Sequence, residues 1–131
     1  MNKTGIRTVS AVAPNQILFE TQHYVAVGAV ISDSNVTAGS DGRKVIKAGT
    51  PLTGSLKART TAFTKASAGS SSAVSDAICI LLHDVDVTDG SNNGTVLISG
   101  FVDLNKIDTT TAALITDYVE TALKGSITFL K

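Results

Sequence analysis

Alternating and continuous apolar runs predict strands in the second half of the chain. Residues 77–87 (AICILLHDVDV) begin fully apolar and end in alternation, which predicts a strand whose first half is buried on both faces. Residues 95–104 (TVLISGFVDL) predict its partner, in which Gly100 marks a bulge or a close contact. Turn-forming residues separate the two runs, so residues 77–104 are predicted to form a hairpin. The partner strand is expected to place four apolar side chains on one face: Val96, Ile98, Val102 and Leu104.

Two segments nearer the start also have strand patterns. Residues 17–31 carry apolar or small side chains on both faces, which is typical of a strand buried on two sides. Residues 43–47 predict a short strand, followed by a turn at Gly49 and an extended stretch at residues 50–52, because the residue before a proline avoids the helical region. Residues 65–75 are rich in Ser, Ala and Gly and predict a mobile loop.

Towards the C-terminus the apolar period changes from that of a strand to that of a helix. Asp108 or Thr109 can cap the helix, Gly125 is placed to end it, and residues 127–130 predict a final strand. One stripe collects the apolar side chains of this helix: Ile115, Tyr118, Val119, Ala122 and Leu123. The chain is therefore predicted to be mainly β with one C-terminal helix, an α+β fold.

The first 16 residues read as an N-terminal arm, and residues 17–131 as a single β-rich domain. The arm is polar and small, and it is predicted to be flexible when free. Its apolar residues are spaced along it and continue at the start of the domain: Ile6, Val9, Val12 and Ile17. Two interpretations stay open. These residues dock on another protein, or the arm is a disordered tail with no role.

Composition narrows the class of protein. The chain has 131 residues, of which 43% are hydrophobic and only 5% aromatic, so the core must consist mainly of aliphatic side chains. No apolar run approaches the roughly 20 residues that span a bilayer, and the start lacks the apolar segment of a secretory signal. We expect a soluble protein, made in a cytoplasm, with no membrane partner.

Charge is balanced overall but unevenly distributed. Residues 41–65 carry a net +5 and residues 76–108 a net −5. Either these are two unrelated solvated faces, or the basic surface of one copy meets the acidic surface of the next, in a head-to-tail contact that closes a ring. The candidates for such a seam are Arg43, Lys44, Lys47, Asp84 and Asp86. A nucleic-acid partner is not expected, because stacking aromatics do not accompany the basic residues.

The residues that carry chemistry elsewhere do not form a recognisable site in this sequence. Cys79 and His83 stand four residues apart on a predicted strand, roughly 13 Å, too far for a nucleophile and its base. Residues 84–90 (DVDVTDG) are a poor match to a calcium loop, because the glycine comes one position late and the twelfth position is Thr95. We therefore expect no catalytic residue, no metal and no cofactor, and a protein that is not an enzyme.

Three stretches, taken in order, resemble the lambda-type head decoration proteins of tailed bacteriophages. They are GRKVIKAGTPL (42–52), AICILLHDVDV (77–87) and NGTVLISGFVDLNKI (93–107). The resemblance implies a small, compact β-rich fold with an extended N-terminal arm. It also implies a homotrimer on the outer capsid surface of the virion, at threefold or quasi-threefold positions. There it would bind the major capsid protein, partly through the arm, and stabilise the shell against internal DNA pressure.

Some features depart from that family. The Ser/Ala-rich loop near residues 65–75 is an insertion relative to the compact lambda member, and no motif of the arm matches residue by residue. A carbohydrate- or receptor-binding surface module of a virion is the alternative function. The low aromatic content argues against it, because sugar sites usually stack on Trp or Tyr.

Overall fold

The computed structural model describes residues 17–20 and 22–131. The expected arm, with its candidates Ile6, Val9 and Val12, lies outside the described residues. The described chain is mainly β, with two short α-helices and a 3₁₀ turn over Leu104–Lys106 near its end. In chain order its strands and helices are β1 (Val25–Ile31), β2 (Val45–Ile46), β3 (Pro51–Thr53), β4 (Thr64–Lys65), β5 (Cys79–Leu81), β6 (Val85–Asp86), β7 (Asn92–Asp103), α1 (Thr109–Ala112), α2 (Asp117–Ala122) and β8 (Ile127–Leu130).

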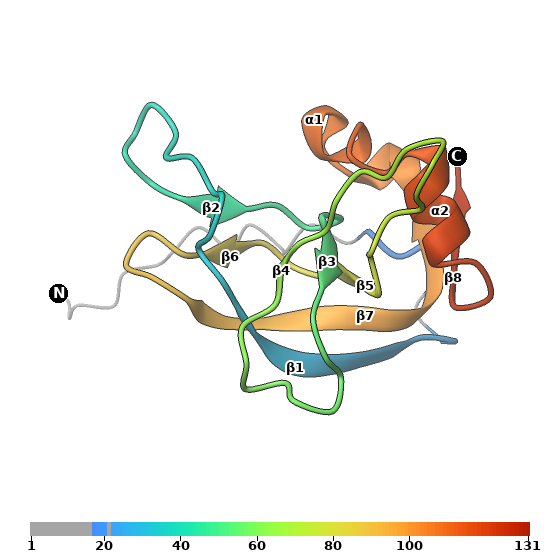
Figure 1. Ribbon diagram of the computed structural model, residues 1–131, viewed down its shortest axis with the longest axis horizontal. Coiled ribbons are helices and arrows are strands. Elements are labelled where there is room, and N and C mark those ends of the chain that lie inside the picture. Colours follow the sequence, from blue (N-terminus) through green and yellow to red (C-terminus); the bar gives the residue numbers. More distant parts are fainter. Residues whose placement is uncertain (1–16, 21) are drawn as a thin grey trace, which may run out of the picture.

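One twisted sheet organises the domain around its longest strand, β7 (Figure 1). The antiparallel order is β1-β7-β5-β3-β4, and β8 pairs in parallel with the last residues of β7. A separate two-stranded ribbon, β2 with β6, stands beside the sheet. The mainly β, α+β class expected from the pattern is confirmed. Neither α-helix in the described chain is long and apolar enough to cross a membrane.

The centre of the sheet is buried on both faces, which explains the continuous apolar run at residues 77–82. Successive residues of β5 enter different clusters: Cys79 and Leu81 pack with Phe63, whereas Ile80 packs with the helices on the other face. A strand covered on both sides cannot alternate apolar with polar residues. The expected hairpin is confirmed in its pairing, since Ile80 lies opposite Leu97.

The expected strand at residues 77–87 is wrong in its second half. The chain leaves the main sheet after Leu81 and joins the ribbon at Val85. This crossing is fixed by Asp84, whose carboxylate accepts a hydrogen bond from the backbone N–H of Ala48 at 2.7 Å. The short strand expected at residues 43–47 is likewise reduced to Val45–Ile46.

The face expected for β7 is also wrong in part. Ala26 pairs with Leu97 and Val25 with Ser99, so Ile98 is an extra residue at a bulge. Val96 and Leu97 alternate regularly into the two buried faces, whereas Ile98, the bulged residue, is only half-buried instead of joining Val96 in the core. Leu104 is also partly exposed, where β7 gives way to the 3₁₀ turn.

Gly49 and Gly100 lie where a side chain would crowd a neighbouring residue. Gly100 was expected at a close contact, and a Cβ there would lie 3.0 Å from the Cβ of Tyr24. Gly49 turns the chain with a φ of 99°, and its added Cβ would lie 2.8 Å from Ile107. At both positions a side chain would force its neighbour to shift, and both glycines have a positive φ that side chains rarely adopt.

The strand expected over residues 17–31 begins only at Val25. Before it, residues 17–19 run antiparallel to the end of β7: Asp103 donates its N–H to the carbonyl of Ile17, and Phe19 donates its own to that of Phe101. The chain bends away between these two segments. Ile17 and Leu18 are therefore buried parts of the domain, although the first strand is shorter than expected.

The single helix expected near the C-terminus is two helices. Asp108 caps α1 and Thr116 caps α2, because each side chain accepts a hydrogen bond from a backbone N–H in the first turn. The residues between them break the helix, so the expected stripe is divided. Val119 and Leu123 are buried, whereas Tyr118 is exposed. Gly125 follows with a φ of 89°, and β8 forms as expected.

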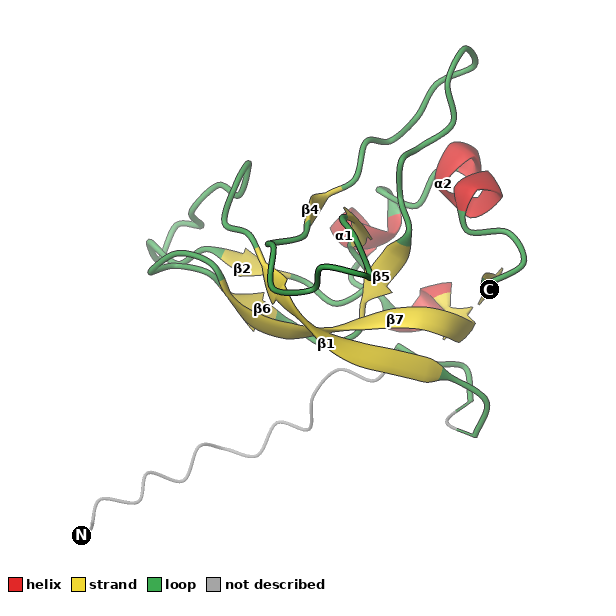
Figure 2. Ribbon diagram, turned by 60° about the horizontal axis from the view of Figure 1, so that its bottom comes forward, coloured by secondary structure: helices red, strands yellow, loops and turns green. Residues whose placement is uncertain are grey.

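The loop between β4 and β5 stands above the sheet beside α2 (Figure 2). Its base is held by side chains: the backbone N–H of Ser67 donates to Asp76 at 2.7 Å, and the hydroxyl of Thr116 donates to the carbonyl of Ala68 at 2.6 Å. Just before it, Phe63 is completely buried and is the largest such side chain described, a core role that the sequence pattern did not indicate.

Candidate functional site

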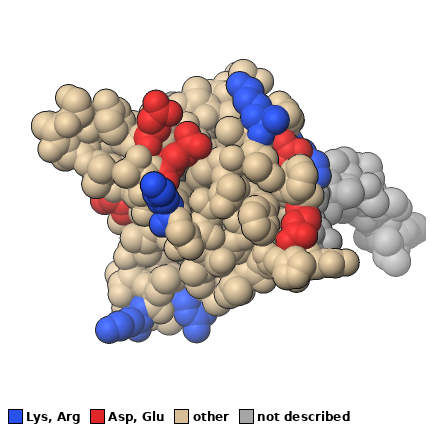
Figure 3. Space-filling view, turned by 90° about the vertical axis from the view of Figure 1, so that its right-hand side faces the viewer, with Lys and Arg blue, Asp and Glu red and all other residues tan. Residues whose placement is uncertain are grey.

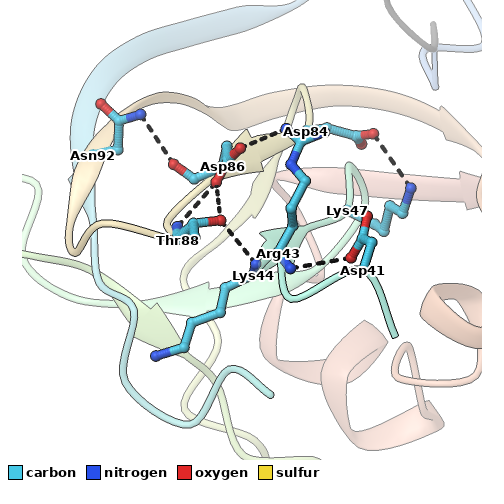
Figure 4. Close-up of polar contacts among 8 residues, drawn as sticks. All are labelled: Asp41, Arg43, Lys44, Lys47, Asp84, Asp86, Thr88 and Asn92. Atoms are coloured by element: carbon cyan, nitrogen blue, oxygen red, sulfur yellow. Dashed lines mark hydrogen bonds and ion pairs between the residues drawn. The ribbon is translucent and has the colours of Figure 1, made fainter. Parts of the chain in front are cut away.

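The five charged residues singled out in the sequence gather at the β2–β6 ribbon. The close-up in Figure 4 shows these side chains, whereas Figure 3 views the molecule from the side of α2 and β8, away from the ribbon. Arg43 and Asp86 form an ion pair at 2.5 Å, and Lys47 and Asp84 form a longer one at 3.8 Å. Four of the five are therefore paired within one chain.

Asp86 is the centre of this cluster. It accepts hydrogen bonds from the hydroxyl and the backbone N–H of Thr88, in addition to that from Arg43. These bonds, that from the Thr88 hydroxyl foremost, hold the pKa of Asp86 well below its usual value, and Asp86 in turn raises the pKa of Arg43. The carboxylate thus stays ionised and fixes the end of the ribbon.

Two neighbours complete the cluster, and the sequence did not single them out. The hydroxyl of Thr88 accepts the backbone N–H of Lys44 at 2.9 Å, and the side chain of Asn92 donates to the carbonyl of Asp86 at 3.0 Å. The Lys44 side chain points away from the carboxylates of Asp84 and Asp86 in Figure 4. Strand-end Asp-x-Thr is a recognisable turn signal that could have identified Thr88 from the sequence.

This arrangement is that of a structural clasp. Both ion pairs are largely exposed, with side-chain exposures of 59% and 39% in the shorter pair, so each contributes little to stability by charge alone. A contact between copies through these residues remains a prediction. Such a contact would have to extend or exchange ion pairs that already exist within each chain.

A second candidate surface lies where the expected arm joins the domain. Phe19 and Phe101 are opposite each other across a backbone hydrogen bond of 2.8 Å, and Val25 lies opposite Ser99 on the same edge of β7. Opposite residues of an antiparallel pair point to the same face, and Ser99 and Phe101 share a face by alternation. Phe19, Val25 and Phe101 therefore form one apolar patch, the arm-base patch.

The arm-base patch is exposed to an unusual degree for such side chains. Phe19 is 56% exposed, Val25 is 55% and Phe101 is 39%. Ile17, the fourth residue proposed for the arm, is instead completely buried against the core. It anchors the start of the described domain, and the exposed apolar surface lies two residues further on. The sequence pattern could have indicated that Phe101 is exposed, because strand alternation places it on the face opposite the buried Val102.

The described residues show no group of three or more His, Cys, Asp or Glu side chains placed to hold a metal ion. The thiol of Cys79 is buried, it donates a weak hydrogen bond to the carbonyl of Leu52 at 3.9 Å, and burial raises its pKa to about 12. A thiol in this setting is a poor nucleophile, because the thiolate is the reactive form.

No protein-family model matches the chain, and no curated protein shows significant sequence similarity to it.

Proposed function

We propose that this chain is a structural head decoration protein of a tailed bacteriophage. It binds the outer surface of the mature head as a homotrimer, at threefold or quasi-threefold positions, and stabilises the shell against the pressure of the packaged DNA. It is made in the host cytoplasm and ends on the virion, with the major capsid protein as its partner. The proposal starts from the resemblance of residues 42–52, 77–87 and 93–107 to that family.

The single observation that supports it most is the arm-base patch. Three large apolar side chains are exposed together on a domain whose other apolar groups of similar size are mostly buried. Contiguous exposed apolar side chains are typical of surfaces that bind another protein, which supports the proposal. Phe19 of the patch comes three residues after the proposed arm ends, so the arm and the patch can engage one surface together.

Trimerisation would strengthen such attachment without strong individual contacts. Once one copy of a trimer has bound, the other two bind from a high effective concentration, which raises the avidity by perhaps 10²–10⁴ fold. A repetitive shell offers such sites by symmetry. A protein with this task needs shape, a stable core and a docking surface, rather than a reactive group.

Cosedimentation with expanded, undecorated heads of the phage that encodes the chain tests the proposal. The variant Phe19→Ser with Phe101→Ser should lose most of its binding, because both exposed rings of the patch are gone. Val74→Ser is the matched control, since Val74 is 59% exposed but lies in the loop before β5. Equal binding by the double variant and the wild type would remove the patch from the proposal, and absence of binding by the wild type would refute the decoration role.

A further inference from the structure

The outer edge of β1 is only half covered. On its inner side β1 pairs with β7, and on its outer side residues 59–63 cover its last part. The backbone N–H of Val30 donates to the carbonyl of Arg59 at 3.2 Å, and the carbonyl of Val30 accepts from Phe63 at 2.8 Å. The backbone groups of Val30 therefore point outward, away from β7.

The same alternation leaves the first part of the edge open. Residues two and four positions before Val30 also point their backbone groups outward, and these are Gly28 and Ala26. The carbonyl of Gly28 accepts a hydrogen bond from the Arg59 guanidinium at 2.8 Å. Within residues 17–20 and 22–131, no hydrogen bond reaches the outward N–H and carbonyl of Ala26 or the N–H of Gly28. Figure 2 shows β1 as the outermost strand of the sheet at this edge.

A groove of about 510 Å³ continues from this open edge. Its floor is formed by residues 28–30 with Asn93 and Gly94, and its wall by the loop between β3 and β4, residues 56–60. That loop carries Lys57 and Arg59, and neither has an ion pair among the described residues. Basic side chains stand at the foot of the molecule in Figure 3 with no acidic side chain beside them.

We propose that the open edge of β1 at residues 26–28 and the adjoining groove bind an extended acidic polypeptide segment as an added strand. The outward N–H and carbonyl of Ala26 and the outward N–H of Gly28 supply backbone hydrogen bonds, and Lys57 and Arg59 bind a carboxylate of the incoming segment. Added strands gain affinity from main-chain bonds and specificity from the side chains beside them. The open stretch is short, so the two cations must select which segment binds.

Gly28 suits this role. A side chain there would stand on the edge, whereas glycine leaves an incoming backbone free to approach, and only the carbonyl of Gly94 comes within 4.0 Å of an added Cβ. Edge strands that have no such purpose are usually covered or blocked by charge. Here the loop covers the far half, and the guanidinium of Arg59 reaches Gly28, where the open half begins.

The test is amide NMR of the full ¹⁵N-labelled chain, titrated with a capped eight-residue peptide of alternating Thr and Val with one central Glu. A second peptide has Lys in place of Glu. We expect the amide signals of Ala26 and Gly28 to shift saturably with the Glu peptide. Replacing Glu by Lys turns an attraction into a repulsion, so binding should be roughly tenfold weaker for the Lys peptide.

Protein variants separate the charges from the backbone. Lys57→Glu should weaken binding of the Glu peptide by about tenfold, whereas Lys131→Glu, the same change at the end of the chain, should alter it less than about twofold. Ala26→Pro removes the outward N–H without touching a bond to β7, and edge strands tolerate proline at such positions. It should abolish the shift at Gly28, with a thermal melt confirming that the variant folds.

Three results would overturn the proposal. The first is no shift at Ala26 or Gly28 at millimolar peptide, and the second is equal binding of the two peptides. The third is a shift of the same two amides when the protein alone is concentrated, which would assign the edge to a second copy of the chain. The experiment contains no phage head, so its failure is distinct from failure of the decoration role.

Discussion

Leu97 and Ile98, adjacent residues of β7, provide the sharpest test of the bulge in this strand. Both faces of β7 are buried here, so a regular strand would bury Ile98 on the face of Val96 as fully as Leu97 on the other face. The bulge opposite Val25 and Ala26 changes this for Ile98: Leu97 is fully buried against the cluster that includes the helices, whereas Ile98 is only half-buried. Replacing each by alanine therefore distinguishes the bulged strand from a regular one.

The expected magnitudes follow from burial. Leu97→Ala removes a completely buried side chain from a packed core and should lower the free energy of unfolding by about 3–4 kcal/mol, from the lost burial and the cavity left behind. Ile98→Ala removes atoms that are partly in water already, so about 1 kcal/mol is expected. For a domain of this size the two changes correspond to roughly 10 °C and 3 °C in Tm.

Urea unfolding followed by circular dichroism measures both variants directly. It should be repeated at two protein concentrations, because an oligomer adds a stability that depends on concentration. Equal losses for the two variants, or a larger loss for Ile98→Ala at both concentrations, would show that β7 has no bulge at this position and that the described register is wrong.

Single residues elsewhere give three more expected outcomes. Gly49→Val should cost at least about 2 kcal/mol in thermal unfolding, because the left-handed φ and the contact with Ile107 both oppose a side chain; Gly42→Ala, at positive φ in open space, should cost about half as much. The pKa of Asp86 is lowered in the fold, so its stabilisation is present above the unfolded pKa of about 4 and is lost as pH falls below it. Asp86→Asn should flatten this acid-side decline in Tm, and an unchanged slope would contradict the clasp. Cys79, whose pKa is raised to about 12, should resist iodoacetamide in the folded protein and react after unfolding in urea; rapid native labelling would contradict its burial.

The spacing of apolar residues predicted strands and helices best where the same spacing continues along a whole element. The apolar run at 77–82, the strand over 95–104, the left-handed Gly125 and the final strand all come from spacing and residue type, and all are present. The break between α1 and α2 was not predicted, because the apolar spacing of Ile115 with the later residues continues through it. The cap at Thr116 restarts the helix in a way that spacing alone does not show.

Features that depend on contacts between residues far apart in the sequence were harder to predict. Arg43 and Asp86 are 43 residues apart, and the sequence showed two oppositely charged segments without indicating that they meet within one chain. Phe63 lies in a polar stretch and becomes a core residue only because β4 folds onto β3. The exposed patch likewise needs the pairing of residues 17–19 with β7, which no local signal specifies.

The most direct measurement of the central claim compares undecorated heads with heads to which the purified protein has been added. Both are heated and treated with chelator, and loss of DNA is followed by dye fluorescence. We expect saturating protein, visible by electron microscopy as trimers at threefold positions, to raise the temperature of DNA release. Identical release from both preparations, with the protein bound, would contradict the claim that this chain stabilises a shell.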